Sequence, residues 1–281
     1  MKVMRNILLI FFVLTVIIHG FFDIKERIGM DTEPPVITAD SDEISLSVKA
    51  DDAEFLSGMQ AIDNKDGDVT DSLVVVAKLD FIQKGTFKVN YAAFDSANNV
   101  ATYTRKVTYT DYRSPHFIAE LPLRYDASNY SSLLNNIRVD DVLDGNITVN
   151  MRISSGTPEG NKNPMILEVT NSAGDTAVIS VNVYLEDRLD ATTPSPALDQ
   201  YILYTPVGQR IDPDAHIIGV YQNWAVREFE ENSVYSEDDI SYDDSAVDYD
   251  TPGEYIITYS LYDEDDELLG TTELYVIVEE V

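Results

Sequence analysis

Closely spaced carboxylates are the side chains of this sequence with the clearest chemical potential. Three of them lie in one short run, Asp-Asn-Lys-Asp-Gly-Asp, and a fourth follows further along the chain. Calcium prefers hard oxygen ligands at this kind of short, alternating spacing. The same run is typical of a tight turn, in which Asp and Asn side chains accept hydrogen bonds from their own backbone. Both interpretations stay open, and the predicted calcium ligands are Asp63, Asp66, Asp68 and Asp95.

A second group of carboxylates lies near the end of the sequence, where acidic residues alternate with tyrosines. Residues 197–281 contain 22 acidic residues and two arginines, in a chain whose formal charge is -31. Charge and aromatic rings together can hold a cationic partner, such as a protein or a surface polymer. The alternative is a solvated loop that keeps an exported protein soluble. The candidate partner-binding residues are Glu237, Asp238, Asp239, Tyr242, Asp243, Asp244 and Tyr249.

Composition and motifs exclude several classes of function. The chain of 281 residues has no cysteine, which removes disulfides, thiol catalysis and thiolate metal sites. Its negative charge opposes binding to nucleic-acid backbones. The sequence has no serine-nucleophile elbow, zinc-protease motif, phosphate loop or dinucleotide glycine pattern. The three histidines, His19, His116 and His216, have the character of ordinary residues, so we predict a protein that is not an enzyme and needs no cofactor beyond the calcium considered above.

Residues 7–22 form an apolar segment that follows a short basic start at residues 1–6. Such a segment is typical of an export signal or a membrane anchor. As a helix it would span about 24 Å, less than the roughly 30 Å of a bilayer core, so length alone leaves both alternatives open. Because the small residues of a cleavage site are poorly represented before Phe21, we favour an uncleaved anchor. The uncompensated Lys2 and Arg5 predict a cytoplasmic start and an extracytoplasmic remainder.

The elements that must position the carboxylates recur three times along the chain. In each repeat, two runs of alternating apolar residues flank a short polar stretch; the repeats are residues 85–111, 165–187 and 253–280. This pattern predicts a β-hairpin with one buried face. Sustained helical periodicity is absent after the apolar segment, so we predict an all-β fold. Trp224, the only tryptophan, is expected to fill a core.

Proline-containing and charged stretches divide the sequence into three modules. Pro34-Pro35 and Ser114-Pro115 each open a repeat, and residues 190–196 have the composition of a short, stiff linker. The predicted organisation is an N-terminal hydrophobic helix followed by three tandem β-sandwich modules. The boundaries are residues 23–33 for the first linker, 188–196 for the second, and 34–111, 112–187 and 197–281 for the modules.

The first repeat resembles the bacterial immunoglobulin-like (Ig-like) domain that occurs in tandem on surface proteins and in some pesticidal crystal toxins. The resemblance is carried by the opening Pro-Pro-Val-Ile, the Asp-Asn-x-Asp-Gly-Asp-Val-Thr turn and the Asp-Ser-Ala-Asn-Asn hairpin tip. The second repeat has Asn171 where the first has Asp95, and the middle turn of the third is unrecognisable. The resemblance covers residues 34–281 and implies β-sandwiches that serve as spacers, stalks or binding modules on exported proteins, normally without catalysis.

These observations predict a membrane-anchored, extracytoplasmic stalk of Ig-like modules whose acidic last module presents an interaction surface. Two alternatives remain: a calcium-rigidified adhesin, and a scaffold subunit of a surface assembly or pilus that joins its neighbours by edge-strand pairing. The expected localisation is the cell membrane, with the bulk of the chain outside the cytoplasm. If the leader is cleaved, the expected localisation is the cell surface or the medium.

Overall fold

Strands account for most of the chain after its first helix, as the alternating apolar residues predict. The computed structural model describes residues 2–29, 31–126, 136–187, 190–230 and 233–280. These residues form two compact units, Met1–Thr110 and Asp111–Val281. The first unit contains one sandwich of two sheets and the second contains two such sandwiches. The predicted all-β architecture after an N-terminal helix is therefore confirmed.

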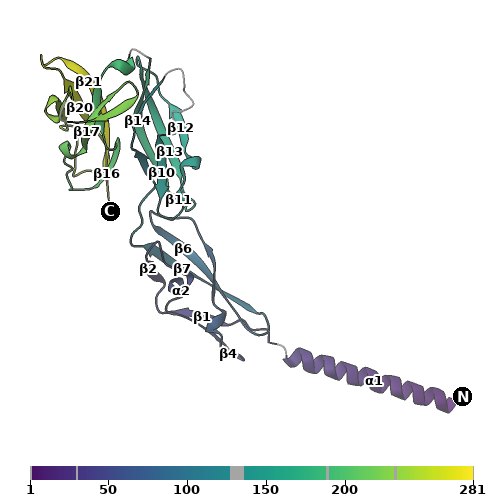
Figure 1. Ribbon diagram of the computed structural model, residues 1–281. Coiled ribbons are helices and arrows are strands. Elements are labelled where there is room, and N and C mark those ends of the chain that lie inside the picture. Colours follow the sequence, from purple (N-terminus) through teal and green to yellow (C-terminus); the bar gives the residue numbers. More distant parts are fainter. Residues whose placement is uncertain (1, 30, 127–135, 188–189, 231–232, 281) are drawn as a thin grey trace. The chain divides into compact units, whose positions relative to one another are not determined.

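The N-terminal helix α1 (Lys2–Gly29), purple in Figure 1, contains the apolar segment. Large apolar side chains between Leu8 and Phe21 are exposed. Among the residues that the structure describes, no helix is both long enough and apolar enough to cross a membrane. Membrane anchoring by residues 7–22 stays a prediction.

The first module is a sandwich of a three-stranded and a four-stranded sheet. The smaller sheet has the order β1-β3-β4 and the larger one the order β2-β7-β6-β5, in which β2 runs parallel to β7. Phe87, Val89 and Tyr91 face the core along β6, and the Tyr91 hydroxyl donates a hydrogen bond of 3.0 Å to the Phe55 carbonyl oxygen. The elements are β1 (Val36–Ala39), β2 (Glu43–Leu46), α2 (Asp52–Phe55), β3 (Met59–Asp63), β4 (Gly67–Asp68), η1 (Thr70–Ser72), β5 (Val74–Lys78), β6 (Thr86–Phe94) and β7 (Val100–Tyr109).

The second module repeats this plan. Its sheets have the orders β8-β10-β11 and β9-β14-β13-β12, and β9 runs parallel to β14 as β2 does to β7. The elements are β8 (His116–Ala119), β9 (Arg124–Asp126), β10 (Ile137–Asp141), β11 (Gly145–Asn146), η3 (Thr148–Asn150), β12 (Arg152–Ser155), β13 (Lys162–Thr170) and β14 (Thr176–Glu186).

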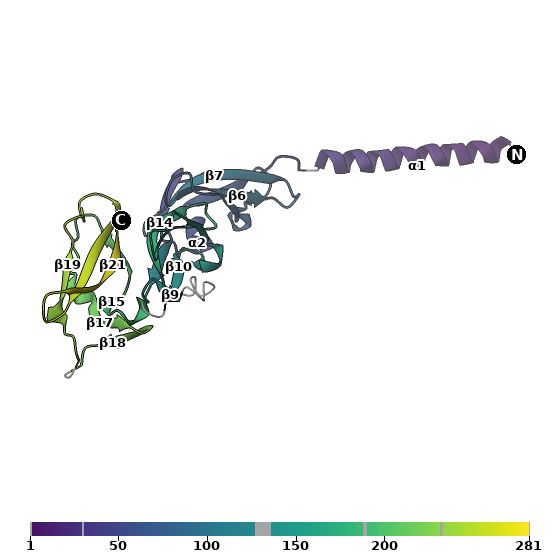
Figure 2. The same ribbon diagram turned by 90° about the horizontal axis from the view of Figure 1, so that it is seen from above.

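The third module has the same two sheets, ordered β15-β17-β18 and β16-β21-β20-β19 and visible in Figure 2. Its first strand begins at Ser195, inside the stretch predicted as the second linker; residues 188–189 of that stretch lie outside the described residues. The elements are η4 (Asp190–Thr192), β15 (Ser195–Leu198), β16 (Ile202–Pro206), η5 (Asp214–His216), β17 (Ile217–Gln222), β18 (Ala225–Glu228), η6 (Glu237–Asp239), β19 (Ile240–Asp243), β20 (Gly253–Tyr262) and β21 (Leu268–Glu279).

The long hairpin of each module turns in the same way. The first residue of the turn is an Asp or Asn whose Oδ1 accepts a hydrogen bond from the backbone amide four residues later. The fourth residue has left-handed backbone geometry, which a turn of this length requires. That residue is Asn98, Gly174 or Asp266, with φ of 67°, 83° and 60°. The repetition seen in the sequence therefore extends to single hydrogen bonds.

Trp224 does not fill a core, contrary to the sequence-based expectation. It forms the tip of the β17–β18 hairpin with Asn223, and the two residues have φ of 64° and 54°. This geometry is that of a two-residue turn, because Gln222 pairs directly with Ala225. The Trp224 side chain is 39% exposed. The tight turn, rather than the apolar character of the indole, determines where the residue lies.

The second and third modules share one hydrophobic core cluster. The backbone amide of Tyr201 donates a 2.7 Å hydrogen bond to the carbonyl oxygen of Ala119. The Arg124 guanidinium forms an ion pair with Glu186, whose side chain is 2% exposed, and it also donates to the carbonyl oxygen of Thr271. These contacts explain why the two modules form a single compact unit.

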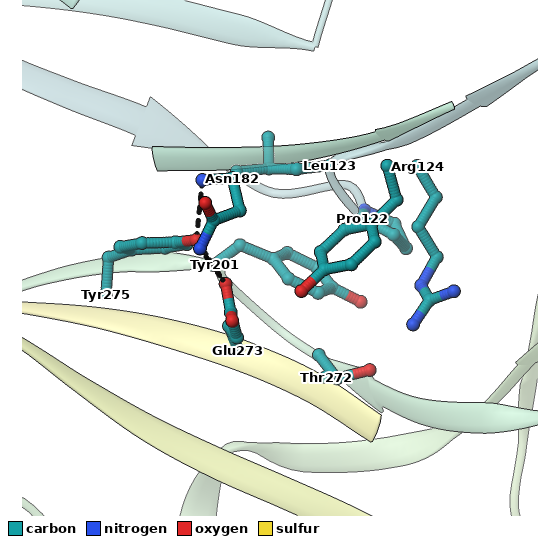
Figure 3. Close-up of a pocket in the computed structure, with 9 residues that line it drawn as sticks. Pro122, Leu123, Arg124, Asn182, Tyr201, Thr272, Glu273 and Tyr275 are labelled. Atoms are coloured by element: carbon teal, nitrogen blue, oxygen red, sulfur yellow. Dashed lines mark hydrogen bonds between the residues drawn. The ribbon is translucent and has the colours of Figure 1, made fainter. Parts of the chain in front are cut away.

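A polar network continues this junction (Figure 3). The Asn182 side chain lies against both Tyr275 and Glu273, donating a 2.8 Å hydrogen bond to Glu273, while its backbone amide donates to the Tyr275 hydroxyl at 2.7 Å. The adjoining cavity, also lined by Tyr201, measures about 20 Å³. A volume of this size holds about one water molecule. The network therefore joins two modules, and the cavity beside it is too small to bind a ligand.

Candidate metal centre and acidic surface

The predicted Asp-rich run is a tight turn between β3 and β4. Asp63 Oδ1 accepts hydrogen bonds from the amides of Lys65 (2.8 Å) and Asp66 (2.9 Å). These two amides, that of Asp66 above all, hold the pKa of Asp63 below its ordinary value, which keeps the carboxyl ionised. Asp68 Oδ1 accepts from the Thr70 amide at 3.0 Å, and Gly67 supplies the required φ of 75°. The structural-turn interpretation thus accounts for one oxygen of Asp63 and for Asp68.

Asp66 is used differently from its neighbours. One of its oxygens accepts from the Ser96 amide at 2.7 Å, and the other lies 3.0 Å from the Ser96 hydroxyl. Asp66 therefore joins the β3–β4 turn to the β6–β7 turn. Asp66 is not among the carboxylates that the structure brings together as possible metal ligands, so its predicted role as a cation ligand finds no support in this geometry.

The joined turns bring Asp95 beside Asp63, and a third carboxylate comes from the leading segment, residues 31–33. The Asn99 amide side chain donates to the carbonyl oxygens of Asp31 (3.1 Å) and Glu33 (3.4 Å) and to Asp95 Oδ2 (2.6 Å). One carboxylate oxygen each from Asp31, Asp63 and Asp95 lies within 4.8 Å of the other two. We call these three residues the acid cluster.

The acid cluster is buried and incompletely hydrogen-bonded. Asp63 and Asp95 are 3% and 7% exposed, and the Asp31 side chain is 9% exposed. Oδ2 of Asp31 and Oδ2 of Asp63 find no hydrogen-bond donor among the described residues. Buried carboxylate oxygens normally have donors or a cation, because an unpartnered buried charge is costly. Oxygen ligands of this kind suit a hard divalent cation such as calcium.

Asp31 is the member of this cluster that sequence reasoning missed. It lies 32 residues before Asp63 and belongs to no recognisable spacing pattern. The available signal was its place three residues before the Pro-Pro that opens the first repeat. Asp63 and Asp95 were predicted and are brought together, whereas Asp66 and Asp68 serve the turns.

The second module builds the same two turns with one chemical difference. Asp141 Oδ1 accepts from the amides of Leu143 and Asp144, both at 2.9 Å, as Asp63 does from its own turn. Asn171 replaces Asp95, and its Nδ2 donates to Asp141 Oδ2 at 3.1 Å and to the Tyr112 hydroxyl at 2.8 Å. The oxygen that has no donor in the first module is therefore satisfied in the second.

The predicted partner-binding residues lie at both ends of β19. Pairing of Ile240 with Leu261 places Glu237–Asp239 beside the β20–β21 turn, where residues 263–267 are five consecutive carboxylates. Asp243 and Asp244 lie at the other end of the strand. Residues 237–239 and 263–267, which we call the acidic end, thus form the densest group of carboxylates in the third module.

Two of the predicted partner-binding carboxylates, Asp239 and Asp243, accept hydrogen bonds that stabilise the local backbone. Asp239 Oδ2 accepts from the Ser236 amide at 2.8 Å and completes a capping box. Asp243 Oδ1 accepts from the Ser245 amide at 3.0 Å, and hydrogen bonds from Ser245 lower the Asp243 pKa. Glu237 and Asp238 are exposed, which leaves them as the better candidates for partner contact.

Tyr249 belongs to the interior, so its predicted contact with a partner is wrong. The residue is 4% exposed, and the Arg210 guanidinium lies 5.4 Å from the centre of its ring. Burial of a large aromatic side chain at the edge of the sandwich stabilises the fold more than exposure would. Tyr242 is 37% exposed and packs its ring 5.9 Å from that of Tyr259, so it remains available.

Comparison with known proteins supports the Ig-like interpretation. Residues 42–109, most of the first module, match the family described as "Bacterial surface protein, Ig-like domain". No curated protein matches the chain. The family match is confined to the first module, and the second and third modules repeat its two-sheet plan. A bacterial surface Ig-like domain implies an extracellular or cell-surface protein with a structural or binding role, and domains of this type are typically non-catalytic.

Several solved structures show weak similarity. The CBM51-2 and INT domains of Clostridium perfringens ZmpB, in complex with GlcNAc, are 16% identical with a TM-score of 0.23 over 52% of this chain and 26% of that one. The M60 catalytic domain of ZmpB with CBM51-1 and CBM51-2 is 11% identical, with a TM-score of 0.22 over 88% and 31%. Mouse cadherin-23 EC22-24 is 12% identical, with a TM-score of 0.18 over 89% and 100%. The chain spans less than a third of the two ZmpB chains.

Proposed function

We propose that this protein is a membrane-anchored, extracytoplasmic stalk that binds a cationic partner through the acidic end of its third module. The observation that carries the proposal is the convergence of exposed Glu237 and Asp238 with the carboxylates of residues 263–267. A dense group of negative charges raises the local concentration of a cationic partner and speeds its association. The mechanism is display of a surface, without turnover of a substrate.

The anchor is the apolar segment at residues 7–22. Its support is the row of large apolar side chains between Leu8 and Phe21, which are exposed and need a nonpolar environment. Fractionation of cells that express the full chain tests this role. We expect the chain in the membrane fraction after alkaline extraction, and external protease should digest its C-terminal modules. Recovery of the intact chain in the soluble fraction would reject the anchor.

The acidic end is tested with the full chain, because the second and third modules share a core and a bait cut between them would disturb it. The variant carries Glu237→Gln and Asp238→Asn, two exposed positions outside the Asp239 capping box. Its binding to native cell surfaces and to immobilised polylysine should fall several-fold at 0.15 M salt. A matched control with Glu228→Gln and Glu230→Gln removes the same charge near β18, in the other sheet. Equal binding by both variants would contradict a localised acidic surface.

A scaffold role is the second candidate, favoured by the exposed edge strand β5. Val74 and Val76 on this strand are 44% and 60% exposed, and β5 pairs with only one neighbour, β6. An exposed apolar edge can recruit a strand from another chain. Sedimentation of the detergent-solubilised chain distinguishes the two candidates: a monomer favours display, and a defined oligomer disrupted by Val76→Lys favours the scaffold.

A further inference from the structure

Among the residues that the structure describes, the charges of the acid cluster do not balance. Three carboxylates lie together, and an ammonium group beside them is that of Lys65, 3.6 Å from Asp31 Oδ1. Lys65 is half exposed, so solvent weakens its attraction for the cluster. One lysine against three carboxylates leaves two negative charges, which is the charge that one divalent cation neutralises.

The second module shows what the same turns look like when no cation is needed. There the residue that replaces Asp95 is an asparagine, and its Nδ2 supplies a proton to Asp141 Oδ2. Asp141 Oδ2 corresponds to Asp63 Oδ2, because in both residues Oδ1 accepts from the following turn. By this equivalence we infer that Asp63 Oδ2 lies on the side of Asp95, and it finds no hydrogen-bond donor among the described residues.

We propose that Asp31, Asp63 and Asp95 bind one calcium ion, which ties the leading segment to the two end turns of the first module. The three carboxylates offer three to six oxygens, and water completes the six to eight that calcium takes. Magnesium demands near-ideal octahedral geometry and holds its water more tightly, so a mixed carboxylate cluster built on two turns and a segment suits it less.

Calcium at this position would hold the segment at residues 31–33 more firmly against the first module. Without the ion, residues 31–33 are held by hydrogen bonds from Asn99, by one from Asn64 to the Glu33 carboxylate and by the Lys65 contact. With it, the segment gains charge-assisted contacts to both turns. This role is independent of the acidic end, which lies in the other compact unit, so either proposal can fail without the other.

Calorimetric titration of the full chain with calcium chloride, after removal of metal by a chelator, tests the proposal. We expect one site per chain with a dissociation constant of about 10⁻⁴ to 10⁻³ M, the range of extracellular modules. At ten times this concentration the first unit should melt about 5 °C higher, because the ion binds only the folded state. Absence of both heat and stabilisation, or an equal response to magnesium chloride, would overturn the proposal.

The decisive variant is Asp95→Asn, which places an amide donor beside Asp63 as Asn171 does beside Asp141, and removes the acceptor of the hydrogen bond from Asn99 Nδ2. It should abolish the response to calcium in a chain that still folds in chelator. Asp71→Asn is the matched control, because it removes one exposed carboxylate from the same module outside the acid cluster; its affinity for calcium should stay within twofold of wild type. An unchanged calcium response in Asp95→Asn, or its loss in Asp71→Asn, would refute the assignment.

Two further measurements keep the test independent of whether Asp95→Asn folds. Asp31 lies outside the sheets. Asp31→Asn should therefore weaken calcium binding at least tenfold and change the melting temperature in chelator very little. Hydrogen exchange should slow on addition of calcium in peptides covering residues 31–35, 63–68 and 95–99, and should not change in residues 141–146 and 171–175. Protection of the second module instead of the first would place the ion elsewhere and reject the proposal.

Discussion

The end turns of the first two modules differ in the side-chain atom that lies beside the buried Asp63 or Asp141. Asp95 and Asn171 have the same shape and cap the same hairpin turn through Oδ1. They differ at the second terminal atom, which is an acceptor in Asp95 and a donor in Asn171. Where the donor is present, the neighbouring Asp141 is fully hydrogen-bonded. If the first module binds calcium as proposed, this atom accounts for the difference between the two modules.

Asn171→Asp is expected to destabilise the second unit by about 1–3 kcal/mol, because Asp141 Oδ2 would lose its buried donor and face another carboxylate. The loss should shrink as the pH falls and one of the two carboxyl groups becomes protonated. Urea denaturation at pH 7 and pH 4 measures both effects. Asn150→Asp adds the same charge at an exposed position and should change stability by less than about 0.5 kcal/mol.

Gly174 is the turn residue whose replacement should matter most for backbone reasons. Its φ is 83°, and a Cβ in the left-handed region costs about 1–2 kcal/mol. Gly174→Ala should therefore lower the urea midpoint of the second unit, whereas Asn98→Ala should cost less, because the native residue already bears a Cβ in this geometry. Equal losses in the two variants would show that hydrogen bonds of the Asn98 side chain outweigh backbone strain.

At the scale of the elements, the long hairpins were predictable and the small connections were not. The hairpins predicted at 85–111 and 253–280 contain β6–β7 and β20–β21, and the one predicted at 165–187 covers β14 and all but the first three residues of β13. Alternation with period two is a local property of the sequence. The first half of strand β15 was interpreted as part of a linker, since its proline and small residues give no such alternation. Its role depends on pairing with β17.

The residues of the candidate metal site also include some that the sequence predicts and one that it does not. Asp63 and Asp95 were predicted because each lies in a recognisable turn. Asp66 and Asp68 were predicted as ligands from their spacing. In the structure their carboxylates accept hydrogen bonds from the backbone amides of Ser96 and Thr70. Asp31 could not be found locally, because its neighbours in space come from turns that fold against the leading segment.

Glu273 on β21 is expected to make the second unit sensitive to acid. Burial acts to raise its pKa, but hydrogen bonds from Tyr275, Asn182 and Lys162 outweigh burial, and the pKa lies below its ordinary value of 4.5. A carboxyl whose pKa is lower in the folded state contributes stability above the unfolded pKa and loses it as the pH falls through the folded one. Stability from this network should therefore be present above about pH 5 and decline below pH 4.5.

Glu273→Gln measures this contribution directly. At pH 7 the variant should be less stable by about 1–2 kcal/mol, because charge-assisted hydrogen bonds become neutral ones. Below the folded pKa of Glu273 the two proteins should converge, since the wild-type carboxyl is then protonated too. A stability difference that stays constant from pH 7 to pH 3 would contradict the assignment of the network to the ionised carboxylate.

At the scale of the whole molecule, three similar sandwiches make two compact units. The third module is the most acidic part of the chain, and its self-repulsion opposes folding on its own. The core cluster that it shares with the second module, together with the Arg124–Glu186 ion pair, offsets this repulsion. The boundary of a repeat in the sequence is therefore not the boundary of a folding unit.

Two calorimetric unfolding transitions are expected rather than three, one for each compact unit. Arg124→Met should leave the transition of Met1–Thr110 unchanged and destabilise Asp111–Val281 by about 3–5 kcal/mol, because it leaves Glu186 buried without its partner. Arg124→Met combined with Glu186→Leu should recover most of the loss, since an apolar pair of similar volume needs no counter-charge. Three separate transitions in the wild-type chain would mean that the second and third modules fold independently. A double variant as unstable as Arg124→Met would mean that the loss does not come from leaving Glu186 without its partner.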